Sequence, residues 1–461
     1  MKLDLKINDF GKIKKVDVSL RPFTMIIGPN GSGKSFITKS LYSIFHAMNQ
    51  DLFAKFIIKN LNFSIYSIEE INVNLIRKSD SDNENINDLR SLLLSLRDDL
   101  SYKFEDITIL QIQEIINFID DKIFKIIGLL NTFKDSLGGK KTKLNSIKSN
   151  LEFLEINLKG FRDVVQDFTK FYSAELSSSL KQEFLNNFLV QSISELQSGN
   201  NDAIFDFGDS DIGEIKLSNN EIFFNINKLA MADIQKLSNV VYLESPIYFK
   251  LRNTLIESRF SGFSFRRKGI INQVPKYFYD VNQLLSSKII SNDSRNSFIN
   301  ILERIENAID GRFDITEQGE IVFKEREREI PFNMVSSGTS NLGMIYLLIK
   351  KNILIKGSYL IIDEPEINLH TEWQHIMLDI LFELSKQGVI VVVASHSLDM
   401  VYRLESIVNN NQELCDAGHF AINRLNKNGY SESRETLLLD ILKAKKELSK
   451  PYIELYNSRL P

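Results

Sequence analysis

The segment from Gly28 to Ser35, with the sequence GPNGSGKS, constrains this chain more than any other. It fits the pattern G-x-x-x-x-G-K-[ST], the P-loop, at every fixed position. The apolar run 23–27 before it reads as a buried strand, and residues 36–48 after it have apolar residues at helical spacing. Glycines in such a loop let backbone N–H groups turn toward a phosphate chain, and the helix that follows points its positive end at the anion. The segment predicts that the chain binds a nucleoside triphosphate.

A second apolar strand, residues 359–362, ends in two carboxylates, Asp363 and Glu364. With a P-loop upstream, Asp363 is predicted to hold Mg²⁺ through water, and Glu364 to orient the attacking water as general base. Lys34 would reach the β- and γ-phosphates, and the hydroxyl of Ser35 would bind the same Mg²⁺. A solvated acidic pair is a poor explanation for carboxylates that follow directly on an apolar strand.

Two more stretches extend the pattern. Ser337 and Gly338 precede an apolar helix, which by itself is an ordinary helix start. However, they come before Asp363 at about the spacing of an ABC-type signature loop, which presents a hydroxyl, N–H groups and a helix dipole to a phosphate. In that architecture the loop completes the site of a second molecule. The buried strand 389–395 delivers His396 at its end, in the position of a switch histidine that senses the γ-phosphate.

Four stretches together, GPNGSGKS (28–35), SSG (336–338), IDEPEINLH (362–370) and ASHS (394–397), resemble the ABC/SMC-like AAA ATPases of the OLD-like and RecF-like group. The resemblance implies an α/β fold, an ABC-type P-loop NTPase head with an inserted α-helical coiled-coil hairpin arm. Residues 1–50 and 200–461 would form the split head, and residues 51–199 the helical insertion.

The resemblance also implies how ATP and Mg²⁺ are held. ATP would lie between two heads in a head-to-tail homodimer or a higher homo-oligomer. Catalytic roles fall to Glu364, His396 and Lys34, and the metal ligands would be Ser35 and Asp363. The nucleotide would contact Asn30, Gly31, Ser32, Gly33, Lys34, Ser35 and Phe36 of one head and Ser337 and Gly338 of the other.

The segment from Glu366 to His370 matches the D-loop of this group. The Q-loop glutamine has no clear counterpart, because Glu244, Ser245 and Pro246 follow the strand that ends at Leu243. Whether Glu244 or Ser245 takes that role stays open.

Within the insertion, apolar residues recur at alternating steps of three and four, the seam of a coiled coil. They predict an antiparallel hairpin over about 105–172 with its turn at Gly138 and Gly139. Two amphipathic helices lying on a globular body remain the alternative, because periods of 3.5 and 3.6 separate poorly over few turns. The polar stretch 79–87 is predicted to be a mobile loop. The seam residues are Ile112, Ile116, Ile119, Ile123, Ile126 and Leu130 in one run, and Leu144, Ile147, Leu151, Leu154, Leu158, Phe161, Val165, Phe168 and Tyr172 in the other.

The composition describes an ordinary globular chain with a formal net charge of −4 and one cysteine, Cys415. A single cysteine excludes an internal disulfide and fits a reducing cytoplasm, where we expect the chain to reside. The N-terminus lacks an apolar core of signal-peptide length, and no uncharged run approaches the ~18 residues of a spanning helix, so no membrane contact is expected.

Two function classes compete. The chain resembles the ATPase subunits of bacterial anti-phage defence systems (Septu, PARIS and retron-associated), which predicts a sensor that controls a separate effector, a nuclease. It also resembles RecF-like DNA-maintenance proteins, which clamp DNA; a transporter motor fits less well because of the long insertion. The stretch after His396 has no Asp-x-Asp pair, so nuclease activity of its own is not expected. Nucleic acid could be contacted at 266–268 or 140–141, although both short basic segments fit solvated loops.

Overall fold

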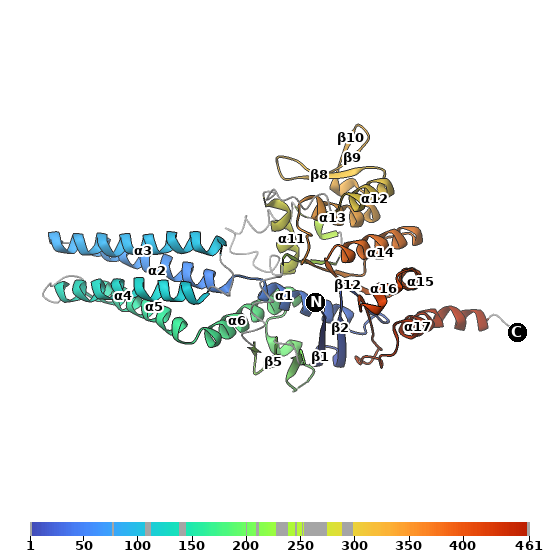
Figure 1. Cartoon of the computed structure of the whole chain (residues 1–461), viewed down its shortest axis with the longest axis horizontal. Coiled ribbons are helices and arrows are strands. Elements are labelled where there is room, and N and C mark those ends of the chain that lie inside the picture. The colour runs from blue at the N-terminus through green and yellow to red at the C-terminus, as the bar shows by residue number, and fades with distance from the viewer. Residues whose placement is uncertain are drawn as a thin grey trace. The chain divides into compact units, whose positions relative to one another are not determined.

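The computed structural model of the chain describes residues 2–75, 78–106, 112–137, 144–199, 201–208, 212–226, 238–244, 247–250, 252, 274–287 and 298–458. They form two compact units (Figure 1). The first, here called the head, comprises Met1–Asn49, Ser177–Asn225 and Lys236–Pro461. The second, here called the helical unit, comprises Gln50–Leu176 and Ile226–Gln235.

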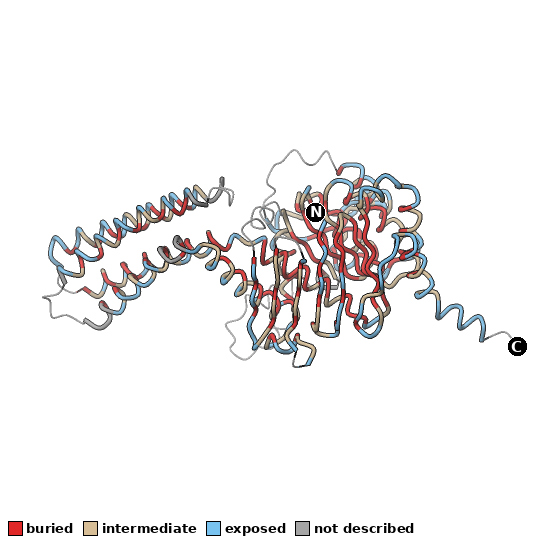
Figure 2. The backbone as a smooth tube through the Cα atoms, turned by 60° about the horizontal axis from the view of Figure 1, so that its bottom comes forward, coloured by how far each residue is buried: buried red, intermediate tan, exposed pale blue. Residues whose placement is uncertain are grey.

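The centre of the head is a parallel sheet of five strands in the order β13-β3-β12-β11-β7. Its members are fully buried or nearly so (Figure 2), which is typical of a sheet covered on both faces. Because the carboxyl ends of parallel strands meet at one edge, this arrangement brings together the loops that follow β3, β11 and β12. The strands are β3 (Phe23–Ile27), β7 (Val240–Leu243), β11 (Tyr359–Asp363), β12 (Ile390–Ser395) and β13 (Phe420–Arg424).

Several helices of the head pack on this sheet. Helix α1 (Lys34–Met48), which follows the P-loop, contacts β7, β11 and β12. Helix α14 (Thr371–Lys386) contacts β12, and α17 (Leu437–Asn457) contacts β13. The other helices among the described residues of the head are α8 (Ile247–Lys250), α11 (Lys276–Ser286), α12 (Ile299–Ile309), α13 (Ser337–Lys350), α15 (Leu398–Asn409) and α16 (Gln412–Asp416), with 3-10 turns η2 (Ile193–Leu196) and η4 (Phe332–Met334).

The head also contains two antiparallel sheets. Five strands in the order β2-β1-β4-β5-β6 form one sheet, and three in the order β10-β9-β8 form the other. Strands β1 and β2 alternate buried and exposed residues along most of their length, which is typical of a half-buried sheet. The strands are β1 (Leu3–Phe10), β2 (Ile13–Leu20), β4 (Ala203–Asp206), β5 (Glu214–Ser218), β6 (Glu221–Asn225), β8 (Arg312–Ile315), β9 (Ile321–Glu325) and β10 (Arg328–Pro331).

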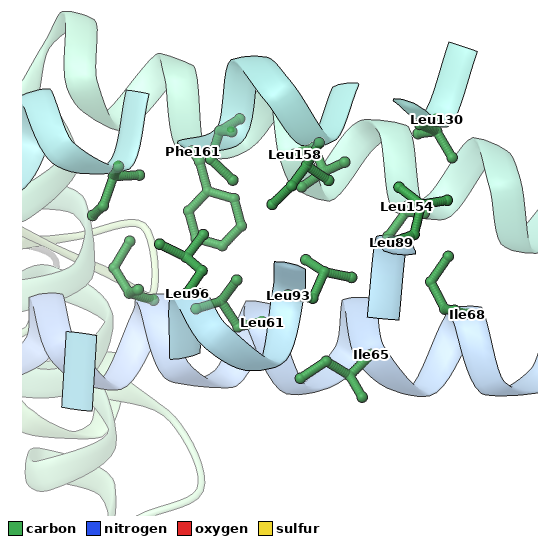
Figure 3. Packing of buried hydrophobic residues seen from close by; sticks show 14 of the residues in the cluster. Leu61, Ile65, Ile68, Leu89, Leu93, Leu96, Leu130, Leu154, Leu158 and Phe161 are labelled. Atoms are coloured by element: carbon green, nitrogen blue, oxygen red, sulfur yellow. The ribbon is translucent and has the colours of Figure 1, made fainter. Parts of the chain in front are cut away.

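In the described part of the helical unit, four long helices share an apolar core. Contacts run between α2 and α3, α3 and α4, α4 and α5, and α5 and α2, so the four helices close into a ring around that core. Leucine, isoleucine and phenylalanine side chains from all four fill its interior (Figure 3). The helices are α2 (Leu52–Asn74), α3 (Asp80–Asp106), α4 (Ile112–Leu137) and α5 (Leu144–Gln166), and α6 (Phe168–Phe188) continues from here into the head.

Helices α4 and α5 are the two arms of the predicted hairpin, and they contact each other. They do not form a two-helix arm, however. Seam residues such as Leu130, Leu154 and Leu158 are buried in one cluster with Leu61 of α2 and Leu93 of α3. The 3.5-residue periodicity therefore reflects the core face of a four-helix unit. The predicted turn at Gly138 and Gly139 lies outside the described residues.

The expectation of a mobile loop over residues 79–87 is wrong, because α3 begins at Asp80. The backbone N–H of Ser79 donates to Asp82 Oδ2 at 2.8 Å, and the N–H of Asp82 donates to Ser79 Oγ at 3.3 Å. This reciprocal pair satisfies N–H groups that the first turn of a helix leaves without partners. The polar residues are a helix start.

The expected end of the insertion is residue 199, but this segment of the helical unit ends at Leu176. Helix α6 crosses from the helical unit into the head at Ser177. Its residue Phe184 is buried against Phe10 of β1, with ring centroids 5.7 Å apart, and against Phe205 of β4 at 6.1 Å. Apolar side chains in the second half of α6, such as Phe184, therefore belong to the core of the head.

Shared packing predicts that the helical unit can be removed only as a whole. Replacing residues 112–166 by a Gly/Ser linker would expose the core faces of α2 and α3, where each buried leucine or isoleucine contributes about 1.5–3 kcal/mol. We expect this variant to aggregate. Replacing residues 50–176 instead should leave a monodisperse head, measured by size-exclusion chromatography and thermal unfolding. A soluble, cooperatively folded 112–166 deletion would contradict the shared core.

Candidate nucleotide site

The P-loop connects the end of β3 to the first turn of α1. Gly31 and Gly33 have φ angles of 73° and 102°, in the left-handed region that glycine adopts without strain. Gly33 is the N-cap of α1 and has no side chain to cap the helix, so the first N–H groups of α1 remain available to a phosphate. The local sequence thus builds an anion site at a helix N-terminus.

Lys34 lies within this loop, and its side chain is buried. Its Nζ donates hydrogen bonds to the carbonyl oxygens of Gly28 at 2.8 Å and Pro29 at 3.2 Å. Burial lowers the pKa of Lys34, and the carboxylates that oppose this change are, in order, those of Glu364, Asp363 and Glu366. The structure therefore brings Lys34 together with the predicted acidic pair.

Strand pairing places that acidic pair. Asp363 is paired with Ala394 of β12, and Ala394 is paired in turn with Ile26 of β3, so the ends of the three strands are level. Glu364 leaves the strand with a φ angle of 53°, and its N–H donates to the carbonyl oxygen of Ala394 at 2.9 Å. The turn after β11 is thereby anchored to the strand that delivers His396.

Asp363 is buried, and burial raises the pKa of its carboxyl group. The nearby charges of Glu244 and Glu364 act in the same direction, whereas the Ser35 hydroxyl and Lys39 oppose it. A carboxyl group in this environment gains from a bound cation. Asp363 and Ser35, the two predicted metal ligands, are neighbours.

The side chain of His396 lies close to two carboxylates. Its Nδ1 lies 3.2 Å from Oε1 of Glu364 and 3.3 Å from Oε1 of Glu366. Oε1 of Glu366 also accepts hydrogen bonds from the Ser395 hydroxyl at 2.8 Å and from the backbone N–H of His396 at 2.9 Å. Glu366 thus fixes the end of β12 and the histidine on it, a role that sequence analysis assigned only as membership of the D-loop.

Several buried polar atoms around the P-loop lack a hydrogen-bond partner among the described residues. They include Ser32 Oγ, Asp363 Oδ1 and Glu366 Oε2. Buried polar groups are normally satisfied, and clusters of exceptions mark places where a ligand or ion binds. With a free N-terminus of α1 and a buried lysine alongside, these donors and acceptors fit a nucleotide with its metal ion, which Ser35 and Asp363 could hold.

Ser337 and Gly338 begin α13, and Ser336 caps it by accepting a hydrogen bond from the N–H of Thr339 at 3.1 Å. This start packs on the D-loop of the same chain: Asn341 Nδ2 donates to the carbonyl oxygen of Ile367 at 2.9 Å. Across the described ranges, no hydrogen bond or ion pair joins residues 336–340 to residues 28–35.

The other predicted nucleotide contacts divide into two kinds. Asn30 is exposed at the loop, whereas the ring of Phe36 packs between those of Phe10 at 5.8 Å and Phe188 at 5.6 Å. Phe36 can therefore offer only its backbone N–H to a phosphate. Lys12 was not predicted, but its Nζ lies 3.3 Å from the position that a Cβ on Gly31 would take, which places a second cation at the loop.

Glu244, one candidate for the Q-loop position, follows β7 and forms an ion pair of 3.0 Å with Lys39 of α1. It also accepts a hydrogen bond from the hydroxyl of Tyr277. Ser245 and Pro246 lie outside the described residues, as do the basic segments 266–268 and 140–141.

The fold and this site define a class of protein. A parallel sheet carries a P-loop after β3, an acidic pair after β11 and a histidine after β12, which together are an ABC-type P-loop NTPase head. The family model described as "AAA ATPase domain" matches residues 1–401. The chain belongs to this family, and its site is that of an ATP-binding ATPase.

Solved structures with a similar fold include the Smc head domain with an extended coiled coil from Pyrococcus furiosus, at 12% identity and a TM-score of 0.40, covering 97% of this chain and 99% of that one. The SMC head domain from Thermotoga maritima matches at 12% identity, a TM-score of 0.33, and 87% and 91% coverage. The ADP conformation of an ATP-binding cassette from an ABC transporter matches at 13% identity and a TM-score of 0.33, covering 98% of this chain and 99% of that one. These distant likenesses concern the fold alone. A comparison with curated proteins gave no match.

None of the helices in the described part of the chain is both long enough and apolar enough to span a membrane.

Proposed function

We propose that this ATPase is the sensor of a bacterial anti-phage defence system, which dimerises around ATP and controls a separate effector nuclease. The dimer is proposed because the predicted site residues fall into two groups, with no hydrogen bond or ion pair between them in the described structure. Lys34, Asp363, Glu364 and His396 lie together, whereas the signature segment 336–340 has no hydrogen bond or ion pair with the P-loop in the described structure. A second copy would supply it.

In the proposed reaction, Lys34 and the N-terminus of α1 bind the β- and γ-phosphates. Ser35 and Asp363 would hold Mg²⁺, which would neutralise charge on the phosphates. Glu364 orients the attacking water and accepts its proton as the water oxygen bonds to the γ-phosphorus, while the bond from that phosphorus to the bridging oxygen breaks and ADP leaves. His396, positioned by Glu366, contacts the γ-phosphate through its other ring nitrogen and so distinguishes ATP from ADP.

The proposal of a separate effector is supported by the metal-binding groups found among the described residues. Outside the nucleotide site, the group that could hold a metal is His46, Glu183 and Asp280. Lys276 already neutralises it, with Nζ 3.1 Å from Glu183 Oε1 and 2.6 Å from Asp280 Oδ2. This is an ion-pair network joining α1, α6 and α11, and it offers no nuclease chemistry. With no second metal-binding site of nuclease type among the described residues, the proposed ATPase would act by making different contacts with another molecule in its two states.

The C-terminal helix α17 is the candidate surface for that molecule. Ile441 of this helix is buried in the head. Exposed apolar side chains remain on both sides of it: Leu438, Leu439, Leu442, Tyr452, Ile453, Leu455 and Tyr456. Such a concentration on one helix is typical of an interaction site.

Purification of the chain with the products of its neighbouring genes tests this function. We expect protection of cells, measured as a lower efficiency of phage plating, to require both a neighbouring nuclease and Glu364. Glu364→Gln should abolish this protection. Protection by the chain alone, or cleavage of DNA or RNA by the chain alone with ATP and Mg²⁺, would contradict the effector. ATP-dependent retention of duplex DNA without any neighbour would favour the DNA-maintenance alternative.

A further inference from the structure

Three tyrosines from different elements pack against one another behind the acidic pair. The rings of Tyr242 and Tyr277 are 4.6 Å apart between centroids, those of Tyr42 and Tyr242 are 5.6 Å apart, and those of Tyr42 and Tyr277 are 6.2 Å apart. Each hydroxyl donates to a different carboxylate: Tyr242 to Asp363, Tyr277 to Glu244 and Tyr42 to Asp280.

Tyr242 is the member of this cluster that reaches the nucleotide site. Strand β7 lies beside β11, with Tyr242 paired to Ile361, two residues before Asp363. The hydroxyl of Tyr242 donates to Oδ2 of Asp363 at 3.2 Å, and both side chains are buried. Thr38 of α1 lies within hydrogen-bond distance of the same hydroxyl, 3.5 Å away. A single buried hydroxyl therefore connects β7, the P-loop helix and the acidic strand.

Because of this hydrogen bond, the two carboxylate oxygens of Asp363 have different environments. Oδ2 of Asp363 is engaged by the tyrosine, while the buried Oδ1 has no hydrogen-bond partner among the described residues. A carboxylate held at one oxygen cannot rotate freely, so the other oxygen presents a fixed direction to a ligand. Burial, and then the charge of Asp363, raise the pKa of Tyr242 well above its usual range, so the hydroxyl remains a donor at neutral pH.

We propose that Tyr242 is a positioning residue for the metal ion: it holds Oδ2 of Asp363 and so aims Oδ1 at Mg²⁺ bound with ATP. The inference rests on the proposed role of Asp363 and adds the residue that orients it. Nothing in the sequence marks Tyr242, because a tyrosine in an apolar strand is ordinarily a core residue.

Tyr242→Phe tests this, because it removes one hydroxyl and keeps the ring. The measurement is fluorescence-detected binding of an ATP analogue, titrated with Mg²⁺. We expect the Mg²⁺ concentration at half-saturation to rise by about 10–100-fold, as for other residues that orient a metal ligand, while binding without Mg²⁺ stays unchanged. Tyr42→Phe is the matched control: it removes a hydroxyl from the same cluster that serves Asp280, and should leave the Mg²⁺ midpoint as in the wild type.

A double-mutant cycle separates positioning from packing. If Tyr242 acts through Asp363, Tyr242→Phe should have no further effect on the Mg²⁺ midpoint in an Asp363→Asn background. An unchanged midpoint in Tyr242→Phe would overturn the proposal. So would a Tyr242→Phe protein that fails to fold while Tyr42→Phe folds, since the hydroxyl would then serve the core. If the wild-type chain itself shows no Mg²⁺-dependent nucleotide binding, the proposed function fails instead.

Discussion

Glu364→Gln is expected to slow ATP hydrolysis by about 10²–10⁴-fold and leave ATP binding intact. Glutamine keeps the shape of the side chain but cannot accept a proton from the attacking water. The backbone anchor of this residue, its N–H on the carbonyl oxygen of Ala394, does not depend on the side chain, so the turn after β11 should persist. Single-turnover hydrolysis and equilibrium nucleotide binding measure the two quantities separately.

The same substitution should trap the dimer, because ATP that is not hydrolysed keeps two heads together. With ATP and Mg²⁺, we expect Glu364→Gln to double its mass in light scattering, whereas Lys34→Ala should lose nucleotide binding and stay monomeric. Lys34 is buried beside three carboxylates, so thermal unfolding must accompany this control to show that the head survives loss of the charge. A Glu364→Gln protein that remains a monomer would contradict the sandwich.

Ser337→Arg is expected to abolish hydrolysis without weakening ATP binding by the chain that carries it. The physical reason is that Ser337 would face the phosphates bound by a partner, where an arginine side chain does not fit. The helix start should survive, because its cap is the neighbouring Ser336, which accepts from the N–H of Thr339. Ser336→Ala is the matched control; it should cost about 1 kcal/mol of stability through the lost cap.

Mixing Ser337→Arg with Lys34→Ala tests completion of the site between molecules. In a head-to-tail dimer the mixed pair has one intact site and one doubly damaged site, so an equal mixture should recover at most about a quarter of wild-type activity. A site built within one chain would recover nothing. Either no recovery or full recovery would therefore speak against the shared site.

The stretches predicted to be catalytic are readable from the sequence because each is local. A P-loop needs a fixed spacing of glycines before a lysine, and Asp363 with Glu364 follows directly on an apolar strand. Parallel strands then have to bring their carboxyl ends together, so the neighbourhood of Lys34, Asp363 and His396 follows from strand order alone. The family match agrees with this class, whereas the roles of the individual site residues, Ser337 and Gly338 included, stay predictions.

Tertiary structure decided what periodicity and spacing leave open. The apolar seam of α4 and α5 is equally compatible with a two-helix arm or a larger bundle, and only packing against α2 and α3 selects the four-helix unit. Tyr242 resembles any core tyrosine until its strand is seen beside Asp363. Glu366 likewise acquires its role from β12, which brings Ser395 and His396 within hydrogen-bond distance of its carboxylate. Sequence encodes local chemistry, whereas contacts between distant segments exist only once burial has fixed their register.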